Sequence, residues 1–349
     1  MLTKRAAVPA VLALLLFAPL TSCGGTIAAT SAPPIQGAAP NRPERSQLRA
    51  VYNTTSGAAV FLPIAAAQQL GEQYGISLDA QYAAPSGGLA SLVSGETQLQ
   101  LAAGPVPIRA IAGGAPLKMI ASFGKTNGYA IVAKSDITTP GDLKGKSIAI
   151  AARGDNTDIS LRVALSHYGL VVDRDVSAVQ VGGDSERLAA LESGRVAASI
   201  LDEGAFGASA ENRGMHVVVS LRQEKLPWIG VALVAGDGFR HDSPNSVTAA
   251  LKSLIDGVRF LADEKNREQS LAIIAQDMKR DPSDPLVLGS YELYHKETGV
   301  FLPTEGLGTI LDALKSTDAA RYSDQPPDKF VDLSFLMNLR ASGFLTALG

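Results

Sequence analysis

A short pattern occurs twice in the chain, 99 residues apart, and constrains the fold more than any other feature. Each copy reads as strand, glycine-bearing turn, short helix, Ser-Gly stop and strand. Leucines three apart predict one apolar helix face, and the glycine after the serine predicts a left-handed helix end. Chance similarity between two βαβ units would give fewer identities, so we favour a structural repeat and expect two similar lobes. The identities are Gln81, Ser86, Leu89, Leu92, Ser94 and Gly95, which recur as Gln180, Ser185, Leu188, Leu191, Ser193 and Gly194.

Short apolar runs alternate with helical patterns over the first two thirds of the chain. This alternation predicts parallel sheets in an α/β fold. From Pro244 onward the pattern predicts helices only, with Ser243-Pro244 as cap and first turn. The expected strands are 48–52, 77–82, 99–102, 117–123, 147–151, 176–181, 197–201 and 217–219.

The first residues have the pattern of a secretory signal. Lys4 and Arg5 precede an apolar run from Val8 to Leu20. That run is shorter than the roughly 20 residues of a membrane-spanning helix, so we favour export over a permanent span. Leu20-Thr21-Ser22-Cys23-Gly24 resembles the bacterial lipobox, which implies lipidation of Cys23 after removal of residues 1–22.

Cys23 is also the only cysteine, which excludes disulfides, a cysteine nucleophile and a cysteine-based zinc site. Residues 23–45 are rich in Ala, Ser, Gly and Pro and predict a flexible tether. The remaining residues are enough for two domains. A net charge of -3 without a basic run argues against nucleic-acid binding.

Five segments, taken in order, resemble the family of nitrate-, sulfonate- and thiamine-precursor-binding proteins (the SsuA/NMT1/THI5-like group of ABC-transporter substrate-binding proteins). The Asp142-Leu143-Lys144-Gly145-Lys146 turn before a strand is the most specific. The others are 63–67, 85–95, 113–118 and 192–198. The resemblance implies the periplasmic binding protein type II fold, an α/β fold with two lobes, two open mixed sheets flanked by helices and a helical C-terminal region.

The same resemblance implies two crossings between lobes, at 129–133 and 229–234. Lobe I is then 46–127 plus 236–349, and lobe II is 128–235. Hinge motion would close a cleft on a small-molecule ligand, which an ABC permease would receive. We expect a monomeric, exported lipoprotein, anchored on the periplasmic or outer face of a bacterial membrane.

Polar turns at the carboxyl ends of the strands should line this cleft. Each turn alone is more simply explained by helix capping, but their convergence favours binding. Small polar groups and helix N-termini would hold a polar or anionic ligand atom. The candidate residues are Asn53, Thr54, Thr55, Ser56, Ser86, Gly87, Gly88, Gly104, Asp155, Asn156, Thr157, Asp184 and Ser185.

Asp202 and Glu203 follow a predicted strand and would repel an anion at the cleft mouth. They favour an amine, an amidine-like ring or a polyhydroxyl ligand; the alternative is that Asp202 caps the next helix and Glu203 faces water. Arg153, preferred over Arg109, could neutralise an anionic group. Trp228 is the best candidate for an aromatic wall, ahead of Tyr52, Tyr129 and Phe206.

Enzymatic chemistry is disfavoured by the sequence. The four histidines have no metal-ligand spacing, no Gly-x-Ser-x-Gly elbow is present, and Cys23 lies in the signal region. We therefore expect no cofactor, no metal and no catalytic residue. Two alternatives stay open: a lipoprotein that senses a ligand for a receptor, and, less favoured, a relative of thiamine-pyrimidine synthase.

Overall fold

The computed structural model describes residues 42–53, 58–83 and 85–345, without the side chains of residues 85, 86, 208 and 209. The expected signal peptide, Cys23 and the expected tether before residue 42 lie outside these residues. Within them, no helix combines the length and the apolar character needed to cross a membrane.

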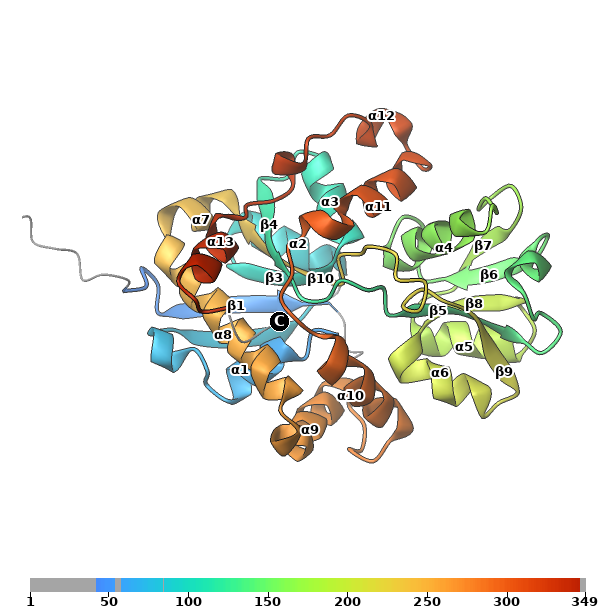
Figure 1. The fold of residues 1–349 in the computed structure, drawn as a ribbon, viewed down its shortest axis with the longest axis horizontal. Coiled ribbons are helices and arrows are strands. Elements are labelled where there is room, and N and C mark those ends of the chain that lie inside the picture. Colours follow the sequence, from blue (N-terminus) through green and yellow to red (C-terminus); the bar gives the residue numbers. More distant parts are fainter. Residues whose placement is uncertain (1–41, 54–57, 84, 346–349) are drawn as a thin grey trace, which may run out of the picture. The chain divides into compact units, whose positions relative to one another are not determined.

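The first five-stranded sheet has the strand order β2-β1-β3-β10-β4 (Figure 1). β1 pairs in parallel with β2 and β3, whereas β10 runs antiparallel to β3 and β4. The sheet is mixed because β10 enters from the other half of the chain. The strands are β1 (Gln47–Tyr52), β2 (Ser77–Tyr82), β3 (Leu99–Ala103), β4 (Leu117–Ser122) and β10 (Val231–Gly236).

The second five-stranded sheet has the equivalent order β7-β6-β8-β5-β9. Here β6 pairs in parallel with β7 and β8, and β5 is the antiparallel strand that enters from the first half. The simple expectation of parallel sheets therefore holds for every strand except the crossing strand of each lobe. The strands are β5 (Tyr129–Lys134), β6 (Ser147–Ile150), β7 (Ser177–Gln180), β8 (Ala198–Asp202) and β9 (Met215–Ser220).

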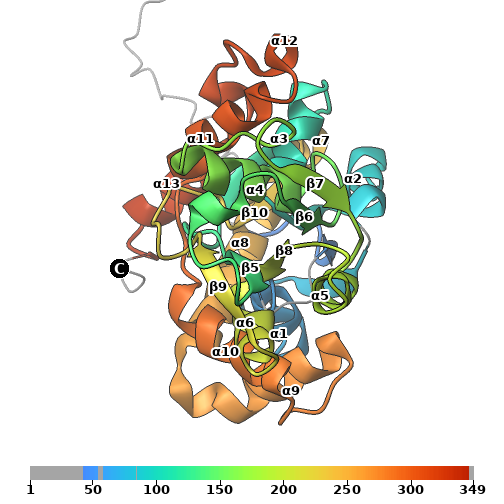
Figure 2. The same cartoon turned by 90° about the vertical axis from the view of Figure 1, so that its right-hand side faces the viewer.

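Helices flank both sheets, and the chain after β10 is helical apart from isolated bridges, as expected (Figures 1 and 2). Short 3-10 helices lie at Glu72–Tyr74, Pro140–Leu143, Glu264–Asn266 and Pro327–Lys329. The first lobe begins with α1 (Phe61–Ala67), α2 (Pro85–Ser94) and α3 (Pro105–Ala112). The second carries α4 (Asn156–His167), α5 (Asp184–Glu192) and α6 (Glu203–Glu211). The tail contains α7 (Asp237–Asp242), α8 (Pro244–Ala262), α9 (Arg267–Met278), α10 (Pro285–Glu297), α11 (Thr304–Lys315), α12 (Ala319–Tyr322) and α13 (Ser334–Ala341).

The sequence repeat corresponds to a structural repeat. Its two copies are β2–α2–β3 and β7–α5–β8, which take the same places in their sheets. Gly95 and Gly194, the predicted helix stops, have φ of 78° and 74°. Glycine adopts the left-handed backbone conformation at little energetic cost, so each helix ends at its Ser-Gly pair.

Each lobe has its own apolar core. In the first, Leu48, Leu99 and Leu233 of the sheet pack with Leu251 and Leu254 of α8. In the second, the sheet packs against α4 in the same way. Burying each such side chain contributes about 1.5–3 kcal/mol, so each lobe has a stabilising core of its own.

The start of α8 differs in one detail from the expectation. Ser243 occupies the N-cap position before Pro244, but its side chain makes no capping hydrogen bond. Instead, the Glu44 carboxylate accepts from the backbone N–H groups of Asn245, at 3.2 Å, and Ser246, at 2.9 Å. A carboxylate far away in the sequence therefore supplies the cap.

Two crossing segments join the lobes and pair with each other. The N–H of Phe123 donates to the Val231 carbonyl at 2.7 Å, and that of Gly230 donates to the Gly124 carbonyl at 3.0 Å. The first crossing follows β4 and leads into β5 at Tyr129. The second crossing precedes β10, whose pairing with β3 and β4 puts it in the first sheet, so the expected boundary at 235 lies one strand too late.

Candidate functional site

A cavity of about 560 Å³ lies between the lobes, at the carboxyl ends of their parallel strands. Its lining comes from the turns after β1, β6, β7 and β8, from both crossing segments, and from α9 and α10 of the tail. This is the edge where open α/β sheets place their ligand sites.

Eight of the candidate residues line this cavity. Most belong to lobe II, and they come from three turns that are distant in the sequence but adjacent at the sheet edge. They are Asn53, Asp155, Asn156, Thr157, Asp184, Ser185, Asp202 and Trp228. The structure thus brings together one turn of the first sheet, three of the second, and a crossing segment.

The other candidates lie elsewhere. Gly88 packs on Gln100, because a Cβ on Gly88 would lie 2.5 Å from Gln100 Nε2. Gly104 is packed against Ile229, and its N–H donates to the Ile229 carbonyl at 3.3 Å. Gly87 and Glu203 are also outside the lining. Thr54, Thr55 and Ser56, and the side chain of Ser86, lie outside the described residues.

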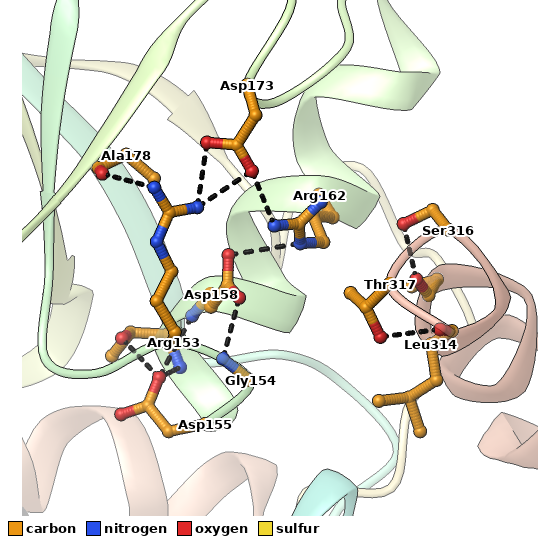
Figure 3. Close-up of polar contacts among 12 residues, drawn as sticks. Arg153, Gly154, Asp155, Asp158, Arg162, Asp173, Ala178, Leu314, Ser316 and Thr317 are labelled. Carbon is orange, nitrogen blue, oxygen red and sulfur yellow. Dashed lines mark hydrogen bonds and ion pairs between the residues drawn. The ribbon is translucent and has the colours of Figure 1, made fainter. Parts of the chain in front are cut away.

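Arg153 is not part of the cavity lining, and its side chain reaches Asp173 and Ala178 instead (Figure 3). Its Nη1 donates to both carboxylate oxygens of Asp173 at 2.8 Å, and its Nη2 donates to the Ala178 carbonyl at 2.8 Å. Arg162 also donates to Asp173, at 3.0 Å. Although desolvation opposes it, these two guanidinium groups lower the pKa of Asp173. Arg153 is therefore held at the outer side of its loop by groups that sequence spacing does not reveal.

Asp155 combines a capping role with a place in the cavity. Its Oδ1 accepts from the N–H groups of Thr157, at 2.9 Å, and Asp158, at 3.0 Å, and from the Thr157 hydroxyl at 2.6 Å. Burial raises the pKa of Asp155, against these hydrogen bonds and the charge of Arg187. The N-terminus of α4 is thus occupied by the protein's own carboxylate.

Asp184 is held by a buried arginine. Arg187 is 1% exposed, and its side chain pairs with Asp184 Oδ1. It also donates to the carbonyls of Ile200, at 2.8 Å, and Gly182, at 2.5 Å. Each of the three guanidinium nitrogens has an acceptor, so Arg187 fixes this turn rather than offering a free charge.

Asp202 caps α6, as the alternative interpretation expected. Its Oδ1 accepts from the Ala205 N–H at 2.9 Å, and its Oδ2 accepts from the Tyr294 hydroxyl at 2.7 Å. Glu203 does not face water: its carboxylate accepts from the Ser220 hydroxyl at 2.6 Å and from Arg222 at 3.2 Å. Only Asp202 of this pair contributes to the cavity.

Aromatic side chains line the cavity on several sides. Trp228, which is 3% exposed, and Tyr129 and Phe206 are in the lining, whereas Tyr52 is not. Tyr52 lies beneath the lining residue Tyr82, with ring centroids 6.0 Å apart. Burial, followed by the nearby Asp184 charge, raises the pKa of Tyr129, so this phenol stays neutral as a hydrogen-bond donor.

The sequence is similar to a known protein family over most of this fold. Residues 58–267, more than half of the 349-residue chain, match the family model described as NMT1/THI5 like. The chain belongs to the NMT1/THI5-like family. No curated protein sequence matches it significantly.

Solved structures share the fold of this NMT1/THI5-like protein. The periplasmic aliphatic sulphonate binding protein SsuA from Escherichia coli has a TM-score of 0.67 and 21% identity, over 81% of this chain and 93% of that one. The periplasmic nitrate-binding protein NrtA from Synechocystis PCC 6803 has a TM-score of 0.67 and 14% identity, over 86% and 90%. The desulfurization enzyme DSZB has a TM-score of 0.63 and 14% identity, over 86% and 100%. These likenesses confirm the two-lobed periplasmic binding protein fold.

Several lining residues of this family member were missed by sequence reasoning. Seven of them come from the tail, which carries no recognised motif: Met278, Arg280, Leu286, Leu293, Tyr294, Glu297 and Thr298. Tyr294 is the most informative of them, since it reaches Asp202 on the other lobe. Its only sequence signal is a tyrosine on an amphipathic helix, which normally indicates a core position.

Proposed function

We propose that this NMT1/THI5-like protein is an extracytoplasmic solute-binding lipoprotein that captures a small polar organic molecule between its lobes. It delivers the molecule to an ABC permease, as a monomer tethered through Cys23. The observation that carries the proposal is a cavity of about 560 Å³ lined by polar turns of both lobes, which two paired crossing segments connect. A volume of this size suits a small organic ligand.

Binding without chemistry is supported by the make-up of the lining. None of the four histidines, all of which are described, lies in it. The lining carboxylates Asp155, Asp184 and Asp202 are engaged in helix caps and an ion pair. Similarity to an enzyme such as DSZB concerns the fold, so it does not argue for catalysis here.

The lobe II half of the cavity disfavours an anionic group. Asp155 and Asp202 fill the N-termini of α4 and α6, the positions where a helix would otherwise hold an anion. Asp184 and Glu186 add two carboxylates in the first turn of α5. All three helices that begin at the lobe II edge of the cavity, α4, α5 and α6, therefore carry carboxylates that would repel nitrate or a sulfonate. Only helices of lobe I remain for an anionic group.

Arginines in the lining do not reverse this charge. Arg187 pairs with Asp184, Arg222 with Glu203 and Glu297, and Arg280 with Asp284. Among the described lining residues there is no further cation. An anion would have to break one of these pairs, which leaves a carboxylate without its counter-charge.

Two acceptor atoms remain available. The hydrogen bonds that Asp155 accepts all use Oδ1, which leaves Oδ2 for a ligand. The Oδ1 of Asn156 is buried and has no hydrogen-bond partner. An unpaired buried acceptor is costly, so Asn156 Oδ1 favours a donor from the solute, and Asp155 Oδ2 offers a second acceptor beside it. We therefore propose that an amine, amidine or hydroxyl group of the solute faces lobe II, with an aromatic wall beside it.

The experiment is a binding screen on the full chain with two readouts. Trp228 is the only tryptophan and lines the cavity, so its fluorescence reports on occupancy directly. Thermal shift provides the second readout, because a ligand at 100 times its Kd stabilises the folded state by about 2.7 kcal/mol. Probes are agmatine, putrescine, thiamine and taurine against nitrate and ethanesulfonate.

Taurine and ethanesulfonate form a matched pair, since they differ by the amino group. We expect the amine-bearing probes to bind and Asp155→Asn to weaken them, while Glu268→Gln, an exposed change outside the cavity, has no effect. Stronger binding of nitrate or ethanesulfonate would disprove the charge assignment and leave solute binding intact. Turnover of any probe would disprove the non-enzymatic function.

A further inference from the structure

Helix α10 contacts both lobes, although it belongs to the C-terminal tail. On one face Val287 and Tyr291 pack in a cluster with Val60 and Ile64 of the first lobe. On another face Leu286 packs with Phe206 and the other apolar residues of lobe II. Figures 1 and 2 both show α10 beside α6. A helix in this position changes its contacts whenever the lobes move apart.

The contact between α10 and α6 depends on two glycines. A Cβ added to Gly289 would lie 2.2 Å from the Gly204 carbonyl oxygen, and one added to Gly204 would lie 2.7 Å from Leu293 Cδ2. Real Cβ atoms do not approach a backbone oxygen so closely, because the interior is already close-packed. Any side chain at position 289 must therefore push the two helices apart.

Tyr294, which directly follows Leu293 in α10, crosses the same junction. Its hydroxyl donates to Asp202 Oδ2 at 2.7 Å, and Asp202 is 5% exposed. The other oxygen of Asp202 holds the start of α6. A hydrogen bond to a buried carboxylate is stronger than one between neutral groups, so this bond fixes a cavity carboxylate from the opposite lobe.

We propose that Tyr294 is a positioning residue for solute binding, which sets the Asp202 carboxylate in the cavity only when the Gly204–Gly289 contact lets α10 close on α6. This inference rests on the proposed solute-binding function and adds the residues that couple lobe closure to the site. Opening the lobes breaks the Tyr294–Asp202 bond, so the cavity is complete only in the closed form.

The first test needs no solute. Gly289→Leu is compared with Gly308→Leu, which lies in α11 with open space around it and carries the same change from glycine to leucine inside a helix. We expect Gly289→Leu to increase the radius of gyration in small-angle X-ray scattering. It should also increase acrylamide quenching of Trp228, while Gly308→Leu matches the wild type. Wild-type values for Gly289→Leu in both measurements would overturn the proposal.

The second test keeps the helix contact and removes the bond. Tyr294→Phe retains the ring, and loss of a hydrogen bond to a charged group should shift the closed-to-open ratio about tenfold. The readout is again acrylamide quenching of Trp228 in the folded protein, which a simple loss of stability does not change. Quenching equal to that of the wild type would overturn the role of Tyr294 even where Gly289→Leu fails to fold.

These measurements separate the inference from the function on which it rests. Wild-type scattering and quenching in both variants, together with agmatine binding, would reject the α10 contact and keep solute binding. The expected shifts without binding of any probe would reject the link between closure and solute capture, and with it this inference.

Discussion

Arg109 of α3 donates from Nη1 to the carbonyl oxygen of Gly154, in the loop before α4, at 2.5 Å. The two residues belong to different lobes. Gly154 has φ of 70°, and a Cβ there would lie 3.0 Å from the Arg109 guanidinium carbon, so a glycine is needed both for the turn and for the contact. Because Asp155 follows directly, Arg109 holds the lobe II turn that carries a cavity carboxylate.

Replacing Arg109 by methionine should loosen this junction. The apolar stem is retained and the donors are lost, so we expect the free energy of unfolding to fall by about 0.5–1.5 kcal/mol in urea denaturation. Arg174→Met is the control, since Arg174 is exposed and pairs only with its neighbour Asp175. A loss no greater than that of the control would show that the Arg109 contact does not stabilise the closed protein.

The pH dependence of amine binding should follow Asp155. Burial raises the pKa of this carboxyl above its ordinary value, and only the ionised form attracts a cation. Agmatine affinity should therefore fall by up to about tenfold per pH unit as the pH drops below that raised pKa. Isothermal titration across the acidic range measures this, and Asp155→Asn should flatten the profile.

The raised pKa of Asp155 has the opposite effect on the stability of the solute-free protein: acid pH favours stability, whereas it weakens amine binding. A raised folded-state pKa means that the folded state binds the proton more tightly than the unfolded state does. Stability from Asp155 is thus fully present below the unfolded pKa and is lost as the pH rises through the folded pKa. An identical pH profile for Asp155→Asn would contradict the burial of this charge.

The Tyr52–Asp277 hydrogen bond should be a measurable coupling between β1 and the end of α9. Tyr52 is 7% exposed, and burial raises the pKa of Asp277 although the tyrosine hydroxyl opposes this. Tyr52→Phe leaves the carboxylate without its donor and should cost about 1–3 kcal/mol in urea denaturation.

A double-mutant cycle with Asp277→Asn should then give a coupling energy of about 0.5–3 kcal/mol. Tyr168→Phe is the matched control, because Tyr168 also donates to a carboxylate, that of Glu224, but lies 38% exposed. Equal effects of the two tyrosine changes, or additive changes at Tyr52 and Asp277, would exclude the coupling.

Local sequence patterns were sufficient to predict the two sheets, the repeat of strand, helix and strand, and the turns of lobe II that reach the cavity. Those features depend on local properties: apolar periodicity, glycines that end helices, and capping carboxylates such as Asp155 and Asp202. Each acts within a few residues of its own position, so it can be recognised without knowing which distant segments pack against it.

Tertiary structure alone decided which charges face the cavity and which are neutralised. Arg153 was expected in the cleft, but Asp173, twenty residues away, holds it outside, and Arg187 is buried beneath Asp184. Tyr294 and Glu297 enter the lining from a tail helix without any motif. The placement of Tyr294 and Glu297 depends on how α10 packs between the two lobes, and that of the two arginines depends on contacts between separate segments of lobe II. Packing of distant segments leaves no periodic signal in either segment.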